Sequence, residues 1–133
     1  MTDMTDQIKH LPDFNVKTIK HQNQRYNTPG DYWKNKKKWE IRISKMKNPD
    51  YEFLVMVHEL VELYLTQKRG ISEEEITKFD LNNPDSDDPG SLSEAPYHRE
   101  HMFSMEVEKL IGKELELNWK GYMNSFNELV YKR

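Results

Sequence analysis

Two segments of the chain carry residue types that can bind a metal ion and activate water. The first is His58-Glu59-Leu60-Val61-Glu62, in which a histidine and a carboxylate stand four residues apart. On an α-helix this spacing places both side chains one turn apart on the same face, where they can chelate one ion. Glu59 points about 100° away around the helix axis, so it can reach water beside the ion without binding the ion itself. We therefore expect His58 and Glu62 as metal ligands and Glu59 as the general base.

The second segment, Ala95-Pro96-Tyr97-His98-Arg99-Glu100-His101, lies downstream and supplies further donor groups. Three of the five histidines of the chain fall within these two segments. A metal site needs ligands from more than one element, so we expect His98 or His101 to complete it. Glu100 is a further candidate, either as a fourth ligand or as a hydrogen-bond partner of a ligating histidine.

The absence of cysteine narrows the metals that such a site can hold. Without cysteine there are no thiolate ligands, no disulfides and no cysteine nucleophile. A donor set of imidazole and carboxylate suits zinc, iron or manganese. The donor set alone leaves the choice among these three metals open.

The first segment lies within a predicted helix that begins at Asn48 and Pro49 and ends at Gly70. Apolar residues cover about two-thirds of its circumference, so the helix is expected to be largely buried. The remaining narrow stripe holds Glu52, Val55, His58, Glu59, Glu62 and Thr66. A histidine and several carboxylates on one strip of a buried helix favour a site over a solvated surface.

The elements around this helix predict an α+β fold in a single domain over residues 1–133. Residues 16–26, 32–33 and 39–44 indicate a small N-terminal antiparallel sheet of two or three strands, with the lysine-rich residues 34–38 as a solvated hairpin tip. Three to four helices follow, with the later ones over 72–80, 96–115 and 118–131. Residues 1–12 are expected to be frayed and residues 82–95 to form a mobile loop.

The helix over 96–115 has two distinct faces. His98 and His101 project to one side, and an apolar set projects to nearly the other. The histidine side is either exposed to solvent or, because Met102 and Met105 flank it, faces the helix of residues 48–69. The apolar side is then expected to pack on the sheet or on the last helix; it comprises Phe103, Val107, Leu110 and Ile111.

Composition and charge limit the partners of the protein. Its 133 residues are 35% hydrophobic and 32% charged, which predicts a modest core, and the net charge of −3 argues against nucleic acid as a partner. The longest apolar run, residues 53–57, is too short to span a bilayer, and the N-terminus lacks a signal pattern. We expect a cytoplasmic protein without a membrane partner, and the sequence leaves the oligomeric state open.

The stretch Val55-Met56-Val57-His58-Glu59-Leu60-Val61-Glu62-Leu63 resembles the zincins, metallopeptidase-like proteins built around an H-E-x-x-H helix that follows a small sheet. The resemblance implies His58 as a ligand, Glu59 as general base, and a downstream histidine or glutamate as third ligand. Glu62 departs from the motif, because the family's second histidine stands at that position. The pairing of this helix with the second segment also resembles a set of small uncharacterised proteins encoded by phages and prophages.

Two functions follow from these patterns. One is a zinc-dependent hydrolase of a peptide or small amide, in which Glu59 takes a proton from water. The other is a non-catalytic interaction module of phage or prophage type, in which the metal only stabilises the fold. A di-iron bundle, a magnesium-dependent nucleotide pyrophosphohydrolase and a metal-free adaptor are further readings with less support in the spacing of the acidic residues.

Overall fold

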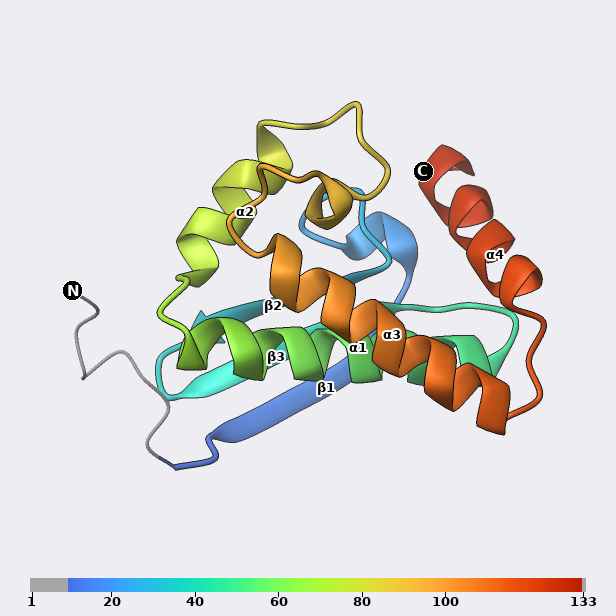
Figure 1. Ribbon diagram of the computed structural model, residues 1–133, viewed down its shortest axis with the longest axis horizontal. Coiled ribbons are helices and arrows are strands. Elements are labelled where there is room, and N and C mark those ends of the chain that lie inside the picture. The colour runs from blue at the N-terminus through green and yellow to red at the C-terminus, as the bar shows by residue number, and fades with distance from the viewer. Residues whose placement is uncertain (1–9, 133) are drawn as a thin grey trace.

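The computed structural model describes residues 10–132 and confirms the α+β prediction (Figure 1). A three-stranded sheet comes first and helices follow. The elements are β1 (Asp13–Ile19), the 3-10 turn η2 (His21–Asn23), β2 (Gly30–Asn35), β3 (Lys38–Ser44), α1 (Pro49–Lys68), α2 (Glu73–Leu81), the 3-10 turn η3 (Pro89–Ser91), α3 (His98–Glu114) and α4 (Trp119–Lys132). The predicted frayed segment over residues 1–12 lies mostly outside the described residues.

The sheet has the order β1-β3-β2 and is mixed, so the expectation of a purely antiparallel sheet was wrong. β2 and β3 form the predicted hairpin, with its exposed tip at the lysine-rich turn. β1 runs antiparallel to β2 in space, but β3 occupies the place between them. β1 therefore pairs with β3 in parallel, in the register Asp13↔Lys38 to Ile19↔Ser44.

β1 is also shorter than the predicted strand over 16–26. The chain turns at His21, whose ring nitrogens bond Ser44 Oγ at 2.8 Å and Asn27 Oδ1 at 2.7 Å. These side-chain bonds offer the backbone an alternative to continued strand pairing.

α1 lies between the sheet and α3 (Figure 1). It begins where predicted, since the Asn48 side chain accepts a hydrogen bond from Asp50 N and Pro49 occupies the first turn. The left-handed Gly70, at φ 75°, follows its C-terminal end. The buried residues of α1 are Leu54, Val55, His58, Glu59, Glu62, Leu63 and Thr66. The predicted polar stripe is thus buried except at Glu52, which is half-buried, whereas Phe53 and Tyr64 are exposed.

The buried face of α3 is the polar one, although its apolar residues predict that the other face is buried. Its buried positions form one stripe of polar and small residues: Glu100, His101, Ser104, Glu108 and Gly112. Phe103 and Leu110 are 55% and 70% exposed, so the expectation that they pack on the sheet or on the last helix was wrong. The polar stripe is buried because it pairs with α1, as described below.

α2, the loop of residues 82–95 and α4 lie around α1 and α3. The predicted capping box starts α2, with reciprocal bonds between Ser72 and Glu75. Residues 82–95 contain no long element, but η3 packs against the start of α3, where His98 Nδ1 lies 3.0 Å from Gly90 O. α4 stands to one side of α3 (Figure 1), to which its Tyr122 is bonded through Glu108. Within residues 10–132 no helix has the length and apolar content needed to cross a membrane.

Candidate metal centre

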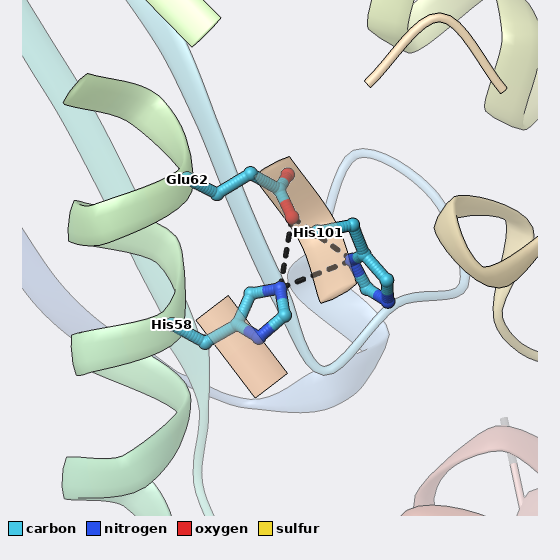
Figure 2. Close-up of side chains that lie close together, drawn as sticks. All are labelled: His58, Glu62 and His101. Carbon is cyan, nitrogen blue, oxygen red and sulfur yellow. Dashed lines mark hydrogen bonds and ion pairs between the residues drawn. The ribbon is translucent and has the colours of Figure 1, made fainter. Parts of the chain in front are cut away.

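His58 and Glu62 project together from consecutive turns of α1 toward α3 (Figure 2). The 3.6-residue period of the helix brings His58 Nε2 within 2.8 Å of Glu62 Oε2. Their exposed fractions are 7% and 4%. Two groups that water normally solvates are therefore buried side by side, which is costly unless they hold a shared partner.

His101 of α3 completes a triangle with these two residues (Figure 2). Its Nδ1 lies 2.9 Å from Glu62 Oε2 and 3.1 Å from His58 Nε2. Within the described part of the chain, this is the one group of three or more histidine or acidic side chains whose donor atoms converge closely enough to hold a metal ion.

Each histidine is also held by a carboxylate on its other ring nitrogen. Glu108 Oε1 makes a short contact with His58 Nδ1, and Tyr122 donates its hydroxyl to Glu108 Oε2 at 2.5 Å. His101 Nε2 lies 2.9 Å from Asp88 Oδ1 in an ion-pair contact. Carboxylates in this position orient metal-ligating histidines and increase their basicity.

The ionisation of the triangle reflects these contacts. Burial alone would lower the pKa of His58, but Glu108 and Glu62 outweigh burial and raise that pKa well above its usual range. Burial likewise opposes the charge of His101, while Asp88 and Glu62 raise its pKa to about 9. Burial would raise the pKa of Glu62, yet hydrogen bonds from both histidines lower it to about 2. Without a metal, positive imidazoles thus surround an ionised carboxylate.

The donor set and its spacing fit a divalent ion. Tetrahedral zinc, with bonds of about 2.0–2.2 Å, holds its donor atoms roughly 3.3–3.6 Å apart. The three distances of 2.8, 2.9 and 3.1 Å are shorter than the lower limit of that range by about half an ångström or less, so the donor atoms would move apart slightly on binding zinc. Two imidazoles and one carboxylate also form a ligand set that iron(II) accepts. The residues present fit such an ion, and a metal would replace the protons that now hold the triangle together.

Glu59 lies in the same cavity but outside the triangle. It is 9% exposed, and within residues 10–132 its carboxyl forms no hydrogen bond and no ion pair. Burial raises its pKa well above the usual range. A Cβ on Gly30 would lie 2.4 Å from Glu59 Oε1, so this position of β2 must be glycine for the carboxyl to fit. A buried carboxyl without a partner is a candidate proton acceptor.

The triangle and Glu59 line a cavity with a volume of about 190 Å³. Its wall includes His58, Glu59, Glu62 and His101, so the triangle and the unpartnered carboxyl face one space. The remaining wall comes from the start of β2, the end of α2, the loop at residues 87–89 and one side of α4.

Two predicted candidates are placed elsewhere. His98 bonds the backbone of Gly90 and does not join the converging group. Glu100 is buried but directed to Arg69, whose Nη1 lies 2.7 Å from Glu100 Oε2. His101 lies on the buried stripe of α3, whereas His98, at the first position of the helix, does not. Glu100 is thus neither a ligand nor a partner of the histidines.

Sequence reasoning missed the two supporting carboxylates. Glu108 lies two turns after His101 on the same stripe of α3, so its spacing of seven residues was a usable signal. Asp88 belongs to the loop, and no periodicity could have indicated it. Tyr122 and Gly30 were likewise outside the predicted site.

Comparison of the chain with protein-family models, with curated proteins and with solved structures gives no match. The resemblance to zincins and to phage-encoded proteins therefore stays a prediction, and function must be argued from the site itself.

Proposed function

We propose that this protein is a zinc-dependent hydrolase of a peptide or small amide bond, with His58, Glu62 and His101 as metal ligands and Glu59 as general base. The observation that supports this most directly is the combination within one cavity of a buried triangle of donors and a buried carboxyl without a partner. A purely structural metal site would not need the second group.

A zinc ion held by three protein ligands would polarise the substrate carbonyl and lower the pKa of an attacking water. The rest of the chemistry falls to the protein. Glu59 takes a proton from the water while the water oxygen bonds to the carbonyl carbon. Glu59 then delivers that proton to the leaving nitrogen as the carbon–nitrogen bond breaks. Burial suits Glu59 to this exchange, because its raised pKa makes the carboxylate a stronger base.

Glu108 and Asp88 have a positioning role in this mechanism. Glu108, bonded to His58 Nδ1, and Asp88, in ion-pair contact with His101 Nε2, would keep His58 Nε2 and His101 Nδ1 directed at the centre of the triangle. Gly30 keeps the wall of the cavity clear for the Glu59 carboxyl.

A structural metal site is the second candidate function. One observation favours it: the triangle joins α1 to α3, and Asp88 ties the loop to the same centre. A metal there would pin three segments together and stabilise the fold. This candidate predicts a large fall in melting temperature with a chelator and no hydrolysis of any substrate.

The first test is metal analysis of tag-free wild-type protein and of His58→Ala. We expect about one equivalent of metal in the wild type and its loss in the variant. The analysis also identifies the metal, so that iron or manganese in place of zinc would be recognised. A wild-type protein that binds no metal ion would refute the proposal.

The second test separates catalysis from structure. Glu59→Gln should keep the metal and lose about 10²- to 10⁴-fold in turnover of a fluorogenic peptide library. Glu106→Gln is the matched control, because Glu106 lies on the exposed side of α3 and pairs with Lys109. Undiminished hydrolysis by Glu59→Gln would end the assignment of Glu59.

A further inference from the structure

The wall of the cavity is strongly acidic. Beyond the carboxylates that hold the triangle, Asp31, Glu59, Asp80 and Asp87 also line it, and among the residues that the structure describes no lysine or arginine does. This is notable in a chain with 20 lysine and arginine residues, which could easily have supplied a basic group. Away from the triangle, a ligand carrying a carboxylate or phosphate would meet repulsion from these side chains.

The protein balances only part of this charge. Asp31 is neutralised by Arg25, whose Nε and Nη2 lie 2.7 and 2.9 Å from its oxygens. A divalent ion at the triangle would offset two of the carboxylates around the histidines. Of the seven carboxyl groups on the wall, four would remain: one beside the histidines, Asp87, Glu59 and Asp80. Within residues 10–132 neither Glu59 nor Asp80 forms an ion pair with a basic side chain.

Asp80 marks one end of the cavity. It accepts hydrogen bonds from Tyr26, at 2.9 Å, and from Tyr97. Burial, in the absence of a counter-charge, raises its pKa to about 6. The ring of Tyr97 packs 5.9 Å from the ring of His101, so Asp80 lies one side chain away from the triangle.

The opposite end of the cavity is apolar. There Tyr122 bonds Glu108 beside His58, and Met105, Met123 and Phe126 form the wall. The triangle thus separates an acidic end, at α2, from an apolar end, at α4. A charged group of a ligand is directed to the first end because the second offers it no partner.

We infer that the substrate carries a cationic group, an ammonium or a guanidinium, that binds beside Asp80 in the cavity that Glu59 also lines. This inference rests on the proposed function, since it names the substrate class of that site. The buried, unpartnered Glu59 is what distinguishes the site from a merely acidic surface: its carboxyl faces the cavity without a donor of its own. A bound cation would supply the missing charge.

Binding of small probes tests the inference without requiring turnover. Butylammonium, butylguanidinium, neutral butanol and anionic butyrate are titrated by NMR into the protein, both with zinc added and as purified. We expect the two cations to bind at least about tenfold more tightly than butanol, and butyrate not to bind beside Asp80. Asp80→Asn should remove most of this preference, whereas Glu106→Gln should leave it unchanged. Equal binding of the neutral probe, or no saturable binding of either cation, would overturn the inference.

Matched peptides identify the source of the cation. One series has a free amino terminus and neutral side chains, and the other is acetylated and carries one lysine or arginine. Faster cleavage of either series over a neutral acetylated peptide supports the inference and tells which cation is recognised. Equal cleavage of the cationic peptides and the neutral acetylated peptide would refute it while leaving the hydrolase proposal intact. Preferential binding of the cationic probes with no cleavage of any peptide would instead refute the hydrolase and leave the cation site.

Discussion

The contact between Glu108 and His58 makes a sharp prediction about metal affinity. Glu108→Gln keeps the shape of the side chain but removes its charge and leaves only one accepting oxygen. His58 would then lose the carboxylate that orients its ring and strengthens Nε2 as a donor. We expect the variant to fold and to bind zinc more weakly.

The burial of the two supporting carboxylates sets the expected magnitudes. Losing such a partner costs about 10- to 100-fold in metal affinity, equivalent to about 1.4–2.7 kcal/mol. The Glu108 side chain is 7% exposed, so water cannot replace it, and the loss should approach the upper value. The Asp88 side chain is 42% exposed, so water can bond His101 in its place. Asp88→Asn should therefore cost about tenfold or less.

The affinity is measured by competition with a chromophoric chelator at about pH 9, where fewer protons compete for the histidine nitrogens. At pH 7 the loss in Glu108→Gln should be smaller, because His58 in the variant also holds its proton less tightly. Glu106→Gln serves as the control on the same helix. A folded Glu108→Gln protein that binds zinc as tightly as the wild type at the higher pH would show that His58 is not a ligand. A larger loss for Asp88→Asn than for Glu108→Gln would contradict the argument from burial.

Three further perturbations follow from the structure. In Gly30→Ala the new Cβ would lie 2.4 Å from Glu59 Oε1, so the carboxyl must move; we expect unchanged metal content and turnover reduced by at least about tenfold, measured on the same peptide library. Asp80→Asn should alter the pH dependence of stability. The folded-state pKa of about 6 exceeds the ordinary 3.8, so the wild type loses stability as the pH rises through this interval, by up to about 3 kcal/mol, and the variant does not. Denaturant unfolding measures the free energy of unfolding of both proteins from pH 4 to pH 7.5. We expect the variant to become more stable relative to the wild type as the pH rises; a constant difference between the two proteins would refute the raised pKa of Asp80. Ser72→Ala removes the capping box of α2 and should cost about 1 kcal/mol in the same assay, with no change in metal content.

The burial of polar groups between α1 and α3 explains why α3 exposes apolar residues. His58 and Glu62 on α1 can be buried only if the facing helix supplies partners, and His101 and Glu108 do so. The small side chain of Ser104, bonded to Glu100 O at 2.8 Å, lets the helices approach. Turning this stripe inward necessarily turns Phe103 and Leu110 outward, because a helix presents opposite faces to opposite sides.

The sequence by itself determined the features that depend on local geometry. The helical period fixed His58 and Glu62 on one face of α1, and the start signals at Asn48 and Ser72 were confirmed because caps are interactions between near neighbours. Strand alternation likewise located the hairpin of β2 and β3.

Only the tertiary structure decided how these elements face one another. Periodicity shows which residues share a face, but not which face turns inward, so it could not choose His101 over His98 or foresee the exposure of Phe103. It could not give the parallel pairing of β1, which depends on the place that β3 takes in the sheet. Asp88 reaches the site from a loop without a period. Two ligands of the metal centre therefore follow from local spacing on α1. The third ligand and the supporting carboxylates depend on how α3 and the preceding loop pack against that helix.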